Sequence, residues 1–396
     1  MKRKFSLPNG IVCLLVILVI FGYLASVMGL SNMLNTMMHT AHDLLINTVF
    51  YIMAICVLTG ALAKIFIDFG VVDLFQKLLR PIMKPLFNLP GVASLGAVMT
   101  FLSDNPAIIS LAQDRKFAKY FKKYQLISLT NFGTAFGMGL IVIVFMIGQG
   151  YFLAPLVGLG GAMIGCIIST RMMQYFVCKD HPDFRDEDAI TEEHTHHNAD
   201  GAESEVEEDG GSETGFVKVL NALLDGGKSG VDIGLAIIPG VLVISTFVMM
   251  ITFGGSTTTG SDGNTVTAFT GAAYEGTRLL PWLAGKIDFV FQWLFGFHAP
   301  ELIAFPITAL GAVGAALGLI PEFVQQGIID GNAIAVFTAM GMCWSGYLST
   351  HTAMLDSLGF RNLLSRAFIS HFIGGIGAGV CAHWLYIGIV ALAGLL

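Results

Sequence analysis

Six uninterrupted apolar runs constrain this chain more than any other feature. They cover residues 11–30, 44–67, 126–148, 152–177, 231–253 and 367–395. A helix of about 20 apolar residues spans a bilayer, whereas the strands of a membrane barrel alternate apolar and polar residues. Only 12% of the residues are charged, against roughly 25% in soluble proteins. The sequence therefore predicts an all-α, polytopic integral membrane protein. It excludes a cytosolic enzyme, a disordered chain and a nucleic-acid binder.

Five further segments complete the expected membrane body. Three apolar runs, 89–113, 299–320 and 333–358, are shorter or broken. Two stretches, 71–87 and 280–297, are amphipathic, which is typical of helices that lie in the membrane interface instead of crossing it. We therefore expect about eight to ten membrane segments, some of them incomplete.

The N-terminus combines positive charge with the first apolar run. Lys2, Arg3 and Lys4 precede residues 11–30. The apolar core of a signal peptide has roughly 7–15 residues, and this run is longer. We therefore expect residues 1–30 to form an uncleaved transmembrane helix with its N-terminus in the cytoplasm.

Half of the acidic residues lie in one segment. Between Asp180 and Glu213 the chain has 14 of its 28 acids and one basic residue, Arg185. Without this segment, 14 acids face 20 Lys and Arg, and the net charge changes from −7 to +6. Dense like charge with few apolar groups is typical of disorder. Residues 178–215 are therefore predicted to be a disordered cytoplasmic loop between two membrane halves, 31–177 and 216–396.

Charge also predicts a re-entrant segment, because Lys and Arg are enriched in short cytoplasmic loops. Segments 64–84 and 114–124 are both basic, the second with five Lys or Arg. A single crossing by residues 89–113 would place them on opposite sides of the membrane. The conflict disappears if this run enters the membrane, breaks at Ser103-Asp104-Asn105-Pro106 and returns.

The residues at this break favour the start of a new half-helix. Asn105 would be its N-cap and Pro106 its first helical residue, with the helix running to about Ala112. Non-helical backbone at membrane depth is tolerated only against protein or a watery cavity. The alternative is an ordinary helix end with a turn at the membrane surface.

Two blocks of sequence recur in the second half. Phe101-Leu102-Ser103-x-x-x-Ala107-Ile108-Ile109 returns as Tyr347-Leu348-Ser349-x-x-x-Ala353-Met354-Leu355, and Asn131-Phe132-x4-Gly137-x-Gly139 returns as His371-Phe372-x4-Gly377-x-Gly379. Transporters are often built from such repeats, with discontinuous helices at the midplane. We therefore expect two related halves and a second break, where Ser349 and Thr350 cap a half-helix that runs to Leu358.

Polar residues inside the apolar runs are the functional candidates, because an ionisable group there is costly. The cluster at residues 103–105 and the cluster at residues 349–352 are expected to face each other. The predicted substrate-binding residues are Ser103, Asp104, Asn105, Asn131, Ser349, Thr350, His351 and Thr352. Asp104, Glu301 and Asp356 are the candidates for ion coupling, and His351 is a candidate proton relay. Capping or bridging between helices is the alternative role for each of them and for His371.

No catalytic or metal-binding motif is complete. The six cysteines are scattered, without a CxxC pair. Gly227-Lys228-Ser229 lacks the first glycine of a P-loop, and Trp344-Ser345-Gly346 lacks the leading glycine of a serine-hydrolase motif. His194, His196 and His197 lie in the acidic loop. We therefore expect no enzyme, no bound metal and no cofactor apart from Na⁺ or H⁺ as a coupling ion.

Several segments resemble a known family of membrane proteins. They are LPGVASLGAVMTFLSDNPAIISLAQD and TNFGTAFGMGLIV in the first half and DGGKSGVDIGLAIIPGVLVISTFVMMITFG in the second. They resemble the nucleoside-recognition or Gate domain family of bacterial inner-membrane proteins, particularly its YjiH-like members. That family is related to concentrative nucleoside transporters and to the Gate regions of ferrous-iron transporters. The resemblance implies a multi-pass protein of the bacterial inner membrane with a transport role.

The sequence thus favours secondary transport of a small polar solute, such as a nucleoside, coupled to H⁺ or Na⁺. The expected partners are the lipid bilayer and the solute, with no nucleic acid, and the oligomeric state is left open. A passive ion or metal channel is the first alternative. A non-transporting membrane scaffold is the second.

The charge argument makes a prediction about topology. Single cysteines at Lys77 and Lys119, in a background without the six native cysteines, should both react with an impermeant maleimide only after the cytoplasmic face is opened. The reason is that both basic segments are expected inside. Labelling of one position from each side of the membrane would contradict the re-entrant interpretation.

Overall fold

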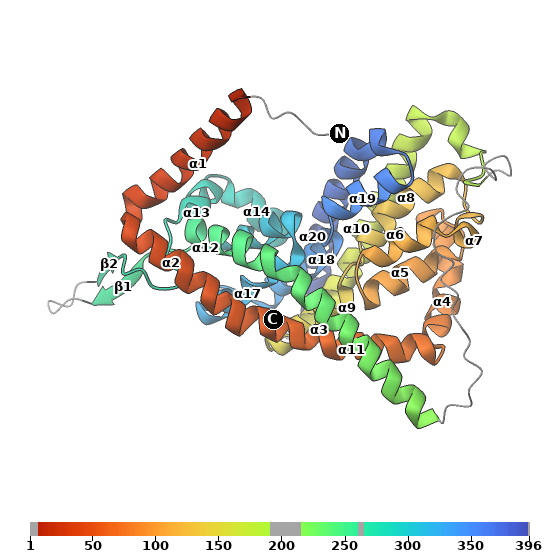
Figure 1. Cartoon of the computed structure of the whole chain (residues 1–396), viewed down its shortest axis with the longest axis horizontal. Coiled ribbons are helices and arrows are strands. Elements are labelled where there is room, and N and C mark those ends of the chain that lie inside the picture. Colours follow the sequence, from red (N-terminus) through yellow and green to blue (C-terminus); the bar gives the residue numbers. More distant parts are fainter. Residues whose placement is uncertain (1–6, 191–214, 260–264, 395–396) are drawn as a thin grey trace.

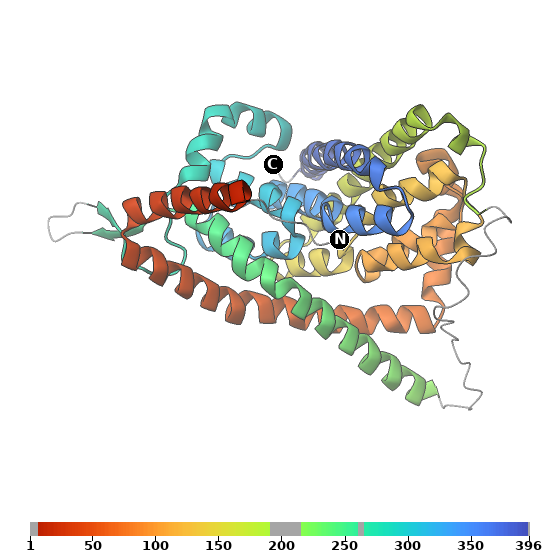
Figure 2. The same ribbon diagram turned by 45° about the horizontal axis from the view of Figure 1, so that its top comes forward.

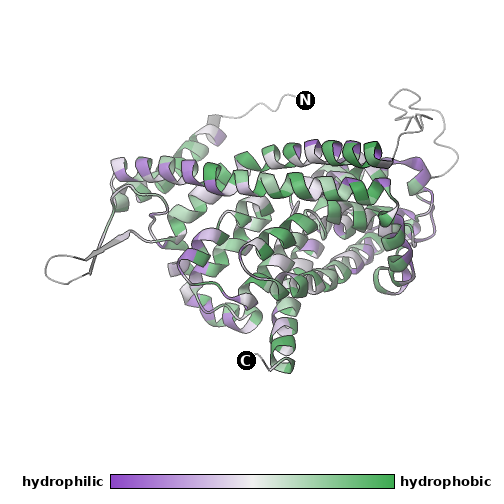
Figure 3. Ribbon diagram, turned by 90° about the horizontal axis from the view of Figure 1, so that it is seen from below, coloured by the Kyte–Doolittle hydropathy of each residue, from purple (hydrophilic) through white to green (hydrophobic). Residues whose placement is uncertain are grey.

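The computed structural model describes residues 7–190, 215–259 and 265–394. Within them, six helices are long and apolar enough to cross a membrane, or seven if one bent pair counts as a span. The six are Asn9–Met28, Leu30–Asp68, Lys123–Gly148, Leu153–Asp180, Gly215–Thr252 and Arg361–Leu392. Each corresponds to one of the six apolar runs, so the prediction of a polytopic all-α membrane protein is confirmed. Hydrophobic residues cover most of the helix lengths, and hydrophilic residues gather near helix ends and in loops (Figure 3).

The first half begins with long helices and ends with another (Figure 1). Its elements are α1 (Leu7–Met28), α2 (Leu30–Asp43), the π-helix η1 (Leu44–Val49), α3 (Phe50–Asp68), α4 (Val71–Ile82), the π-helix η2 (Met83–Phe87), α5 (Ala93–Leu102), α6 (Pro106–Gln113), α7 (Arg115–Ala118), α8 (Lys123–Thr134), α9 (Gly139–Gly148), α10 (Leu153–Asp180) and the 3₁₀ turn η3 (Pro182–Arg185).

The second half contains the one β-hairpin found in the described residues. Its elements are α11 (Gly215–Gly240), η5 (Val241–Ser245), α12 (Thr246–Thr252), β1 (Ser256–Thr259), β2 (Thr265–Ala268), α13 (Leu279–Ala284), η6 (Gly285–Ile287), α14 (Asp288–Phe295), η7 (Pro300–Ile303), α15 (Ala304–Gly311), α16 (Val313–Leu317), α17 (Ile320–Gln325), α18 (Gly331–Cys343), α19 (Ser349–Ser357), η8 (Arg361–Leu363) and α20 (Leu364–Leu392). The strands are antiparallel, and Ser256 pairs with Ala268.

Helices α5 and α6 form a hairpin. In a continuous helix, Gly96 and Ile108 would lie about 18 Å apart along the axis, at 1.5 Å per residue. Instead, Cδ1 of Ile108 lies 2.5 Å from the position of a Cβ on Gly96. The chain therefore folds back between them, and the break predicted at residues 103–106 is confirmed, with Pro106 as the first residue of α6.

A second hairpin is formed by α15 and α16. Phe305 of α15 and Val313 of α16 lie 3.3 and 3.2 Å from a Cβ placed on Gly341 of α18. Each half thus repeats one order of elements: a hairpin, a helix that is interrupted near its middle, and a long helix. The order is α5–α6, α8–α9 and α10 in the first half, and α15–α16, α18–α19 and α20 in the second.

This order pairs the halves differently from the sequence blocks. Ser103 follows the first arm of a hairpin, whereas Ser349 begins α19 after the interruption of another helix. Asn131 lies in α8, but His371 lies within α20. The pairing of those blocks was therefore wrong, because short apolar stretches match one another through composition alone.

Small residues let the long helices approach closely. Helices α3 and α11 cross each other (Figures 1 and 2), where a Cβ on Gly230 would lie 2.2 Å from the carbonyl oxygen of Cys56. Helices α10 and α20 pack together in the same way, and a Cβ on Gly161 would lie 2.7 Å from the carbonyl oxygen of Ala378. Close backbone approach of this kind drives helix association in lipid, where apolar burial contributes little.

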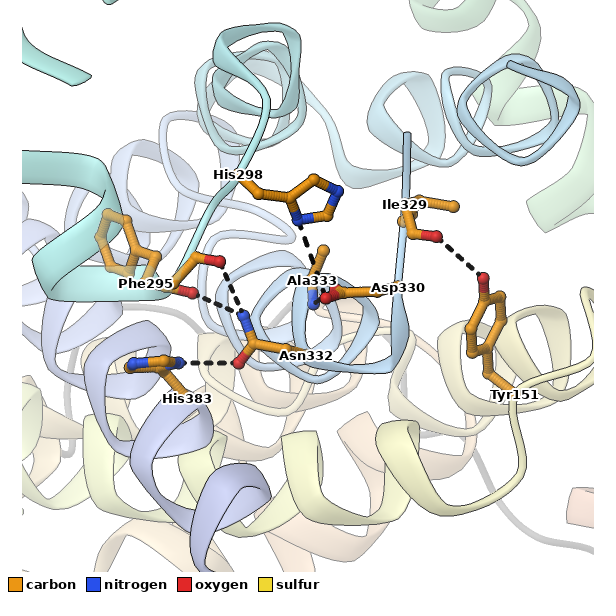
Figure 4. A network of polar contacts seen from close by, with 9 residues as sticks. Tyr151, Phe295, His298, Ile329, Asp330, Asn332, Ala333 and His383 are labelled. Carbon is orange, nitrogen blue, oxygen red and sulfur yellow. Dashed lines mark hydrogen bonds and ion pairs between the residues drawn. The ribbon is translucent and has the colours of Figure 1, made fainter. Parts of the chain in front are cut away.

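The helix pair 279–295 and 300–311 is bent by 76°, and α18 and α20 fix the bend (Figure 4). Nδ2 of Asn332 donates to the carbonyl oxygens of Phe295, at 2.8 Å, and Gly296, at 3.3 Å. Its Oδ1 accepts from Nδ1 of His383 at 2.7 Å. One buried amide side chain therefore ties three segments together.

The predicted acidic loop begins later than expected. Helix α10 continues to Asp180, and residues 182–190 follow it in an ordered course against the start of α8. Lys122 pairs with Asp188 at 2.8 Å, and Lys123 pairs with Glu187. The prediction of disorder for residues 178–190 was wrong, because the first acids find counterions in the basic segment 114–124. Residues 191–214 lie outside the described residues.

The loop after α12 is organised by one carboxylate. Glu275 accepts hydrogen bonds from Ser256 Oγ and Thr270 Oγ1 and from the backbone N–H groups of Thr270 and Gly271. Burial by itself would raise the pKa of Glu275, but these hydrogen bonds outweigh burial and lower it below the ordinary 4.5. The loop is therefore held by an ionised glutamate.

Asn332 gives a test of the bent pair. Asn332→Ala should destabilise the protein by about 1–3 kcal/mol, because buried carbonyl oxygens and His383 lose their partner. A lower melting temperature of the purified protein in detergent would show this loss. Asn362→Ala, at an exposed position, is the matched control and should melt like the unchanged protein. Equal melting of the two variants would contradict the role of Asn332.

Candidate functional site

Two apolar helices are interrupted near their middle. Residues 135–138 separate α8 from α9, and residues 344–348 separate α18 from α19. Met138 adopts a left-handed conformation with φ of 55°, which prevents the helix from continuing. Each interruption leaves backbone N–H and C=O groups without their helical partners. Such groups need partners from elsewhere when they lie at membrane depth.

The tip of the α5–α6 hairpin lies between these two interruptions. Nδ2 of Asn105 donates to Oγ of Ser345 at 3.2 Å, and Oγ of Ser345 donates to the carbonyl oxygen of Thr134 at 3.2 Å. Asn105 is only 4% exposed. A single chain of hydrogen bonds therefore joins the hairpin tip, the end of α8 and the interruption between α18 and α19.

Glycine is required on both sides of Asn105. A Cβ on Gly137 would lie 2.3 Å from Oδ1 of Asn105 and 2.3 Å from Oγ of Ser345. A Cβ on Gly346 would lie 2.5 Å from Nδ2 of Asn105 and 2.1 Å from Oγ1 of Thr350. The two interruptions thus form a narrow polar seat for the Asn105 amide, which also contains Thr350.

Unpartnered polar atoms gather around this seat. Among the described residues, the buried side-chain atoms without a hydrogen-bond partner include Asp104 Oδ1, Asn105 Oδ1, Thr130 Oγ1, Asn131 Oδ1 and both ring nitrogens of His351. Buried polar groups are nearly always paired, and an unpaired one is costly. A concentration of them at the hairpin tip, in α8 and in α19 therefore indicates a place that accepts a polar ligand or an ion.

A second polar network lies beside the seat. Nδ2 of Asn131 donates to Ser169 Oγ at 2.9 Å and to Ser370 Oγ at 3.0 Å, and Ser169 Oγ contacts His371 Nδ1 at 2.8 Å. The ring of His351 packs on His371 with centroids 4.5 Å apart. This network connects α8, α10, α19 and α20, and it satisfies His371 but leaves His351 unpaired.

The structure brings some of the predicted site residues together. Asn105 and Thr350 share the seat, with Asp104 next to Asn105 in the chain, while Asn131 and His351 belong to the second network. Asn105 is the N-cap residue of α6, as predicted, but its side chain makes no cap hydrogen bond and bonds Ser345 instead. The tertiary contact replaces the local one.

Other predicted residues lie elsewhere. Ser349 is exposed, and Leu348, not Ser349 or Thr350, is the N-cap of α19. The hydroxyl groups of Ser103 and Thr352 donate to backbone carbonyls four residues earlier in their own segments. Glu301 pairs with Arg278, and Asp356 pairs with Arg361 at 2.6 Å. Each of these two carboxylates already has a local countercharge.

Sequence reasoning missed Ser345, Ser169 and the role of two glycines. Ser345-Gly346 was considered only as part of an incomplete hydrolase motif, and Gly137 only as part of a repeated sequence block. The available signal was a glycine next to polar residues in the middle of an apolar run. Neither residue type is required for a continuous apolar helix, so their presence indicates an interruption or a close contact.

A small cavity adjoins the hairpin tip. Its volume is about 230 Å³, and it is lined by Ser103 together with residues of α3, α9 and α11, including Cys56, Lys64 and Asp225. It lies where α3 and α11 cross and reaches from the tip to charged residues of both helices. The hairpin tip therefore borders a space that contains polar groups.

Part of this chain is similar to a known protein family. Residues 45–150 match the family model described as Gate, nucleoside recognition. These residues contain α5, α6 and the interruption between α8 and α9. An uncharacterized protein of Alkalihalophilus pseudofirmus is 29% identical over 116 residues, which are 28% of this chain and 25% of that protein. The chain thus spans about a quarter of the curated relative it matches.

The fold of this chain is similar to that of CNTnw. CNTnw in an inward-facing substrate-bound state has a TM-score of 0.52 at 13% identity, over 85% of this chain and 74% of that chain. A doubly substituted CNTnw in an outward-facing state has a TM-score of 0.54 at 14% identity, over 87% and 76% of the two chains. The similarity covers both halves of this chain, so the arrangement of hairpins and interrupted helices is that of the CNTnw fold.

The polar seat predicts different effects for two neighbouring serines. Ser345→Ala should destabilise the protein by about 1–3 kcal/mol, because the buried Asn105 amide loses its partner. Ser349→Ala, the matched control at an exposed position, should have no measurable effect. Thermal melting of both purified variants measures the difference. A stable Ser345→Ala protein would show that the hairpin tip is held by other contacts.

Proposed function

We propose that this protein is a secondary transporter of a small polar solute and that the solute is a nucleoside. The observation that carries the proposal is the Asn105 seat, where a hairpin tip meets two interrupted helices and leaves buried acceptor atoms of Asp104 and Asn105 unpaired. Discontinuous helices at the junction of two repeats are typical of transporter binding sites.

The chemistry of the seat suits a nucleoside. Helices α6 and α19 both begin there, and the N-terminal end of each carries partial positive charge. Asp104, Asn105, Ser345 and Thr350 supply acceptors and side-chain donors. A nucleoside presents ribose hydroxyl groups and an acceptor-rich base, which match both kinds of group. The Gate description and the fold of CNTnw support the same solute class.

Asp104 is the residue proposed to carry the coupling ion. Its Oδ1 is buried without a partner, whereas Glu301 and Asp356 are paired with arginines. A membrane carboxylate can exchange a proton, or it can bind Na⁺ together with carbonyl oxygens of interrupted helices. Transport with coupling requires no covalent step, so the proposed activity is not enzymatic.

The proposed setting is the bacterial inner membrane, with the N-terminus in the cytoplasm. Basic segments 64–84 and 114–124 support this orientation, because such segments are retained inside. The structure adds that residues 182–190 pack on the start of α8, so this ordered part of the acidic segment lies on the same face as residues 114–124.

Asp104→Asn tests the proposal. The variant keeps the shape of the side chain but removes its charge, so accumulation of a radiolabelled nucleoside in proteoliposomes should fall by about tenfold or more, the effect of losing about 1.4 kcal/mol of coupling. Exchange of nucleoside across the membrane without a gradient should persist. Asp356→Asn, the matched control, should accumulate nucleoside like the unchanged protein.

The other outcomes separate the alternatives. Full accumulation by a well-folded Asp104→Asn protein would contradict the role of Asp104. Uptake by the unchanged protein that stops at equilibrium under both H⁺ and Na⁺ gradients would indicate a passive channel. The absence of exchange for every nucleoside tested would contradict the proposed solute class.

A further inference from the structure

A second cavity lies beneath the amphipathic helix α4. Its volume is about 290 Å³, and residues of α3, α4, η2, α5, α8, α9 and α10 line it. All of the lining side chains are aliphatic, aromatic or thioether groups, among them Phe75, Leu79, Ala97 and Met163. We refer to this space as the α4 cavity. It contains no polar group that could bind the solute of the transporter.

The α4 cavity is lined both by the amphipathic helix and by the middle of a membrane helix. Phe75 and Leu78 belong to α4, and Phe136 belongs to the interruption near the middle of the span 123–148. Amphipathic helices lie in the membrane interface, whereas the middle of a spanning helix lies within the hydrocarbon core, which is about 30 Å thick. This apolar lining therefore suits an acyl chain of a phospholipid.

Helix α4 divides its residues between lipid and water. Leu74 and Leu78 are 66% and 70% exposed on the apolar side. Lys77, Arg80 and Lys84 are exposed at helical spacing on the polar side, and none of them has an ion pair within the described part of the chain. Asp73, also exposed, is the acidic residue of α4.

This pattern places unneutralised positive charge above an apolar space. Amphipathic helices with Lys and Arg on the polar face bind anionic lipid surfaces. The long side chains of Lys and Arg reach around such a helix to the level of the headgroups. A zwitterionic lipid would fill the same cavity but would gain less from three cations.

We propose that the α4 cavity binds an anionic glycerophospholipid, with one acyl chain inside the cavity and the phosphate at the basic edge of α4. The inference does not rest on the proposed transport function. The bound chain would contact Ala97 and Phe101 of α5, the helix that leads to Asn105. A lipid at this position would therefore support the hairpin arm that carries the polar seat.

Native mass spectrometry of the purified full chain tests the proposal. The protein is mixed with equal amounts of phosphatidylglycerol and phosphatidylcholine that have the same acyl chains. The unchanged protein should retain one phosphatidylglycerol about tenfold more often than phosphatidylcholine, a difference of about 1.4 kcal/mol. The combined variant Lys77→Gln, Arg80→Gln and Lys84→Gln should lose this preference.

Two further variants separate the acyl chain from the charge. Ala97→Phe fills the cavity but keeps the cations, so retention of both lipids should fall. Where Ala97→Phe does not fold, Ala97→Leu makes the same test with a smaller side chain. The control variant Lys116→Gln, Lys119→Gln and Lys179→Gln removes three other exposed lysines and should behave like the unchanged protein.

Three results would overturn the proposal. Equal retention of the two lipids by the unchanged protein would exclude recognition of an anionic headgroup. Unchanged retention by a folded cavity variant would show that no acyl chain occupies the cavity. Loss of the preference in the control variant would show that total charge, not the edge of α4, attracts the lipid.

Discussion

The need to pair backbone groups inside a membrane governs this structure. A bilayer core offers no water, so an unpaired N–H or C=O group there is costly, and helices satisfy these groups internally. The chain nevertheless interrupts two of its apolar helices, at residues 135–138 and 344–348. Both interruptions lie against the tip of the α5–α6 hairpin, where Ser345 accepts from Asn105 and donates to the carbonyl oxygen of Thr134. The site of proposed function is therefore the place where the fold departs from continuous helix.

Small side chains make this departure possible. Gly137 and Gly346 leave room for the Asn105 amide, and a Cβ at either position would lie within 2.5 Å of its polar atoms. The same property brings α3 to α11 and α10 to α20, where backbone meets backbone. In lipid, apolar burial does not drive helices together, so close packing and polar contacts must do so. The glycines of this chain thus serve both the assembly of the membrane body and the geometry of its polar seat.

Local sequence predicted the breaks better than the contacts. The Ser103–Pro106 turn was predicted from loop charge and from Pro106, because both act over a few residues. Asn105 is the predicted N-cap residue of α6, but its side chain makes no cap hydrogen bond, since its amide bonds Ser345, 240 positions away in the chain. Part of the loop that was predicted to be disordered is also ordered. Residues 178–190 have a defined structure because Lys122 and Lys123 provide countercharge. In each case a residue far along the chain replaced the expected local partner.

The sequence by itself determined the class of the molecule and the positions of its six membrane helices, because an apolar run of sufficient length has one stable form in a bilayer. It also indicated which polar residues lie at membrane depth. Only the tertiary structure decided which of them meet: Asn105 joins Ser345 and Thr350, whereas Glu301 and Asp356 pair with arginines and Ser349 faces outward. The correspondence between the two halves was likewise decided by the order of their helices and not by the repeated sequence blocks. The physical reason is that hydropathy is a property of each segment alone, whereas a polar seat depends on how close distant backbones can approach one another.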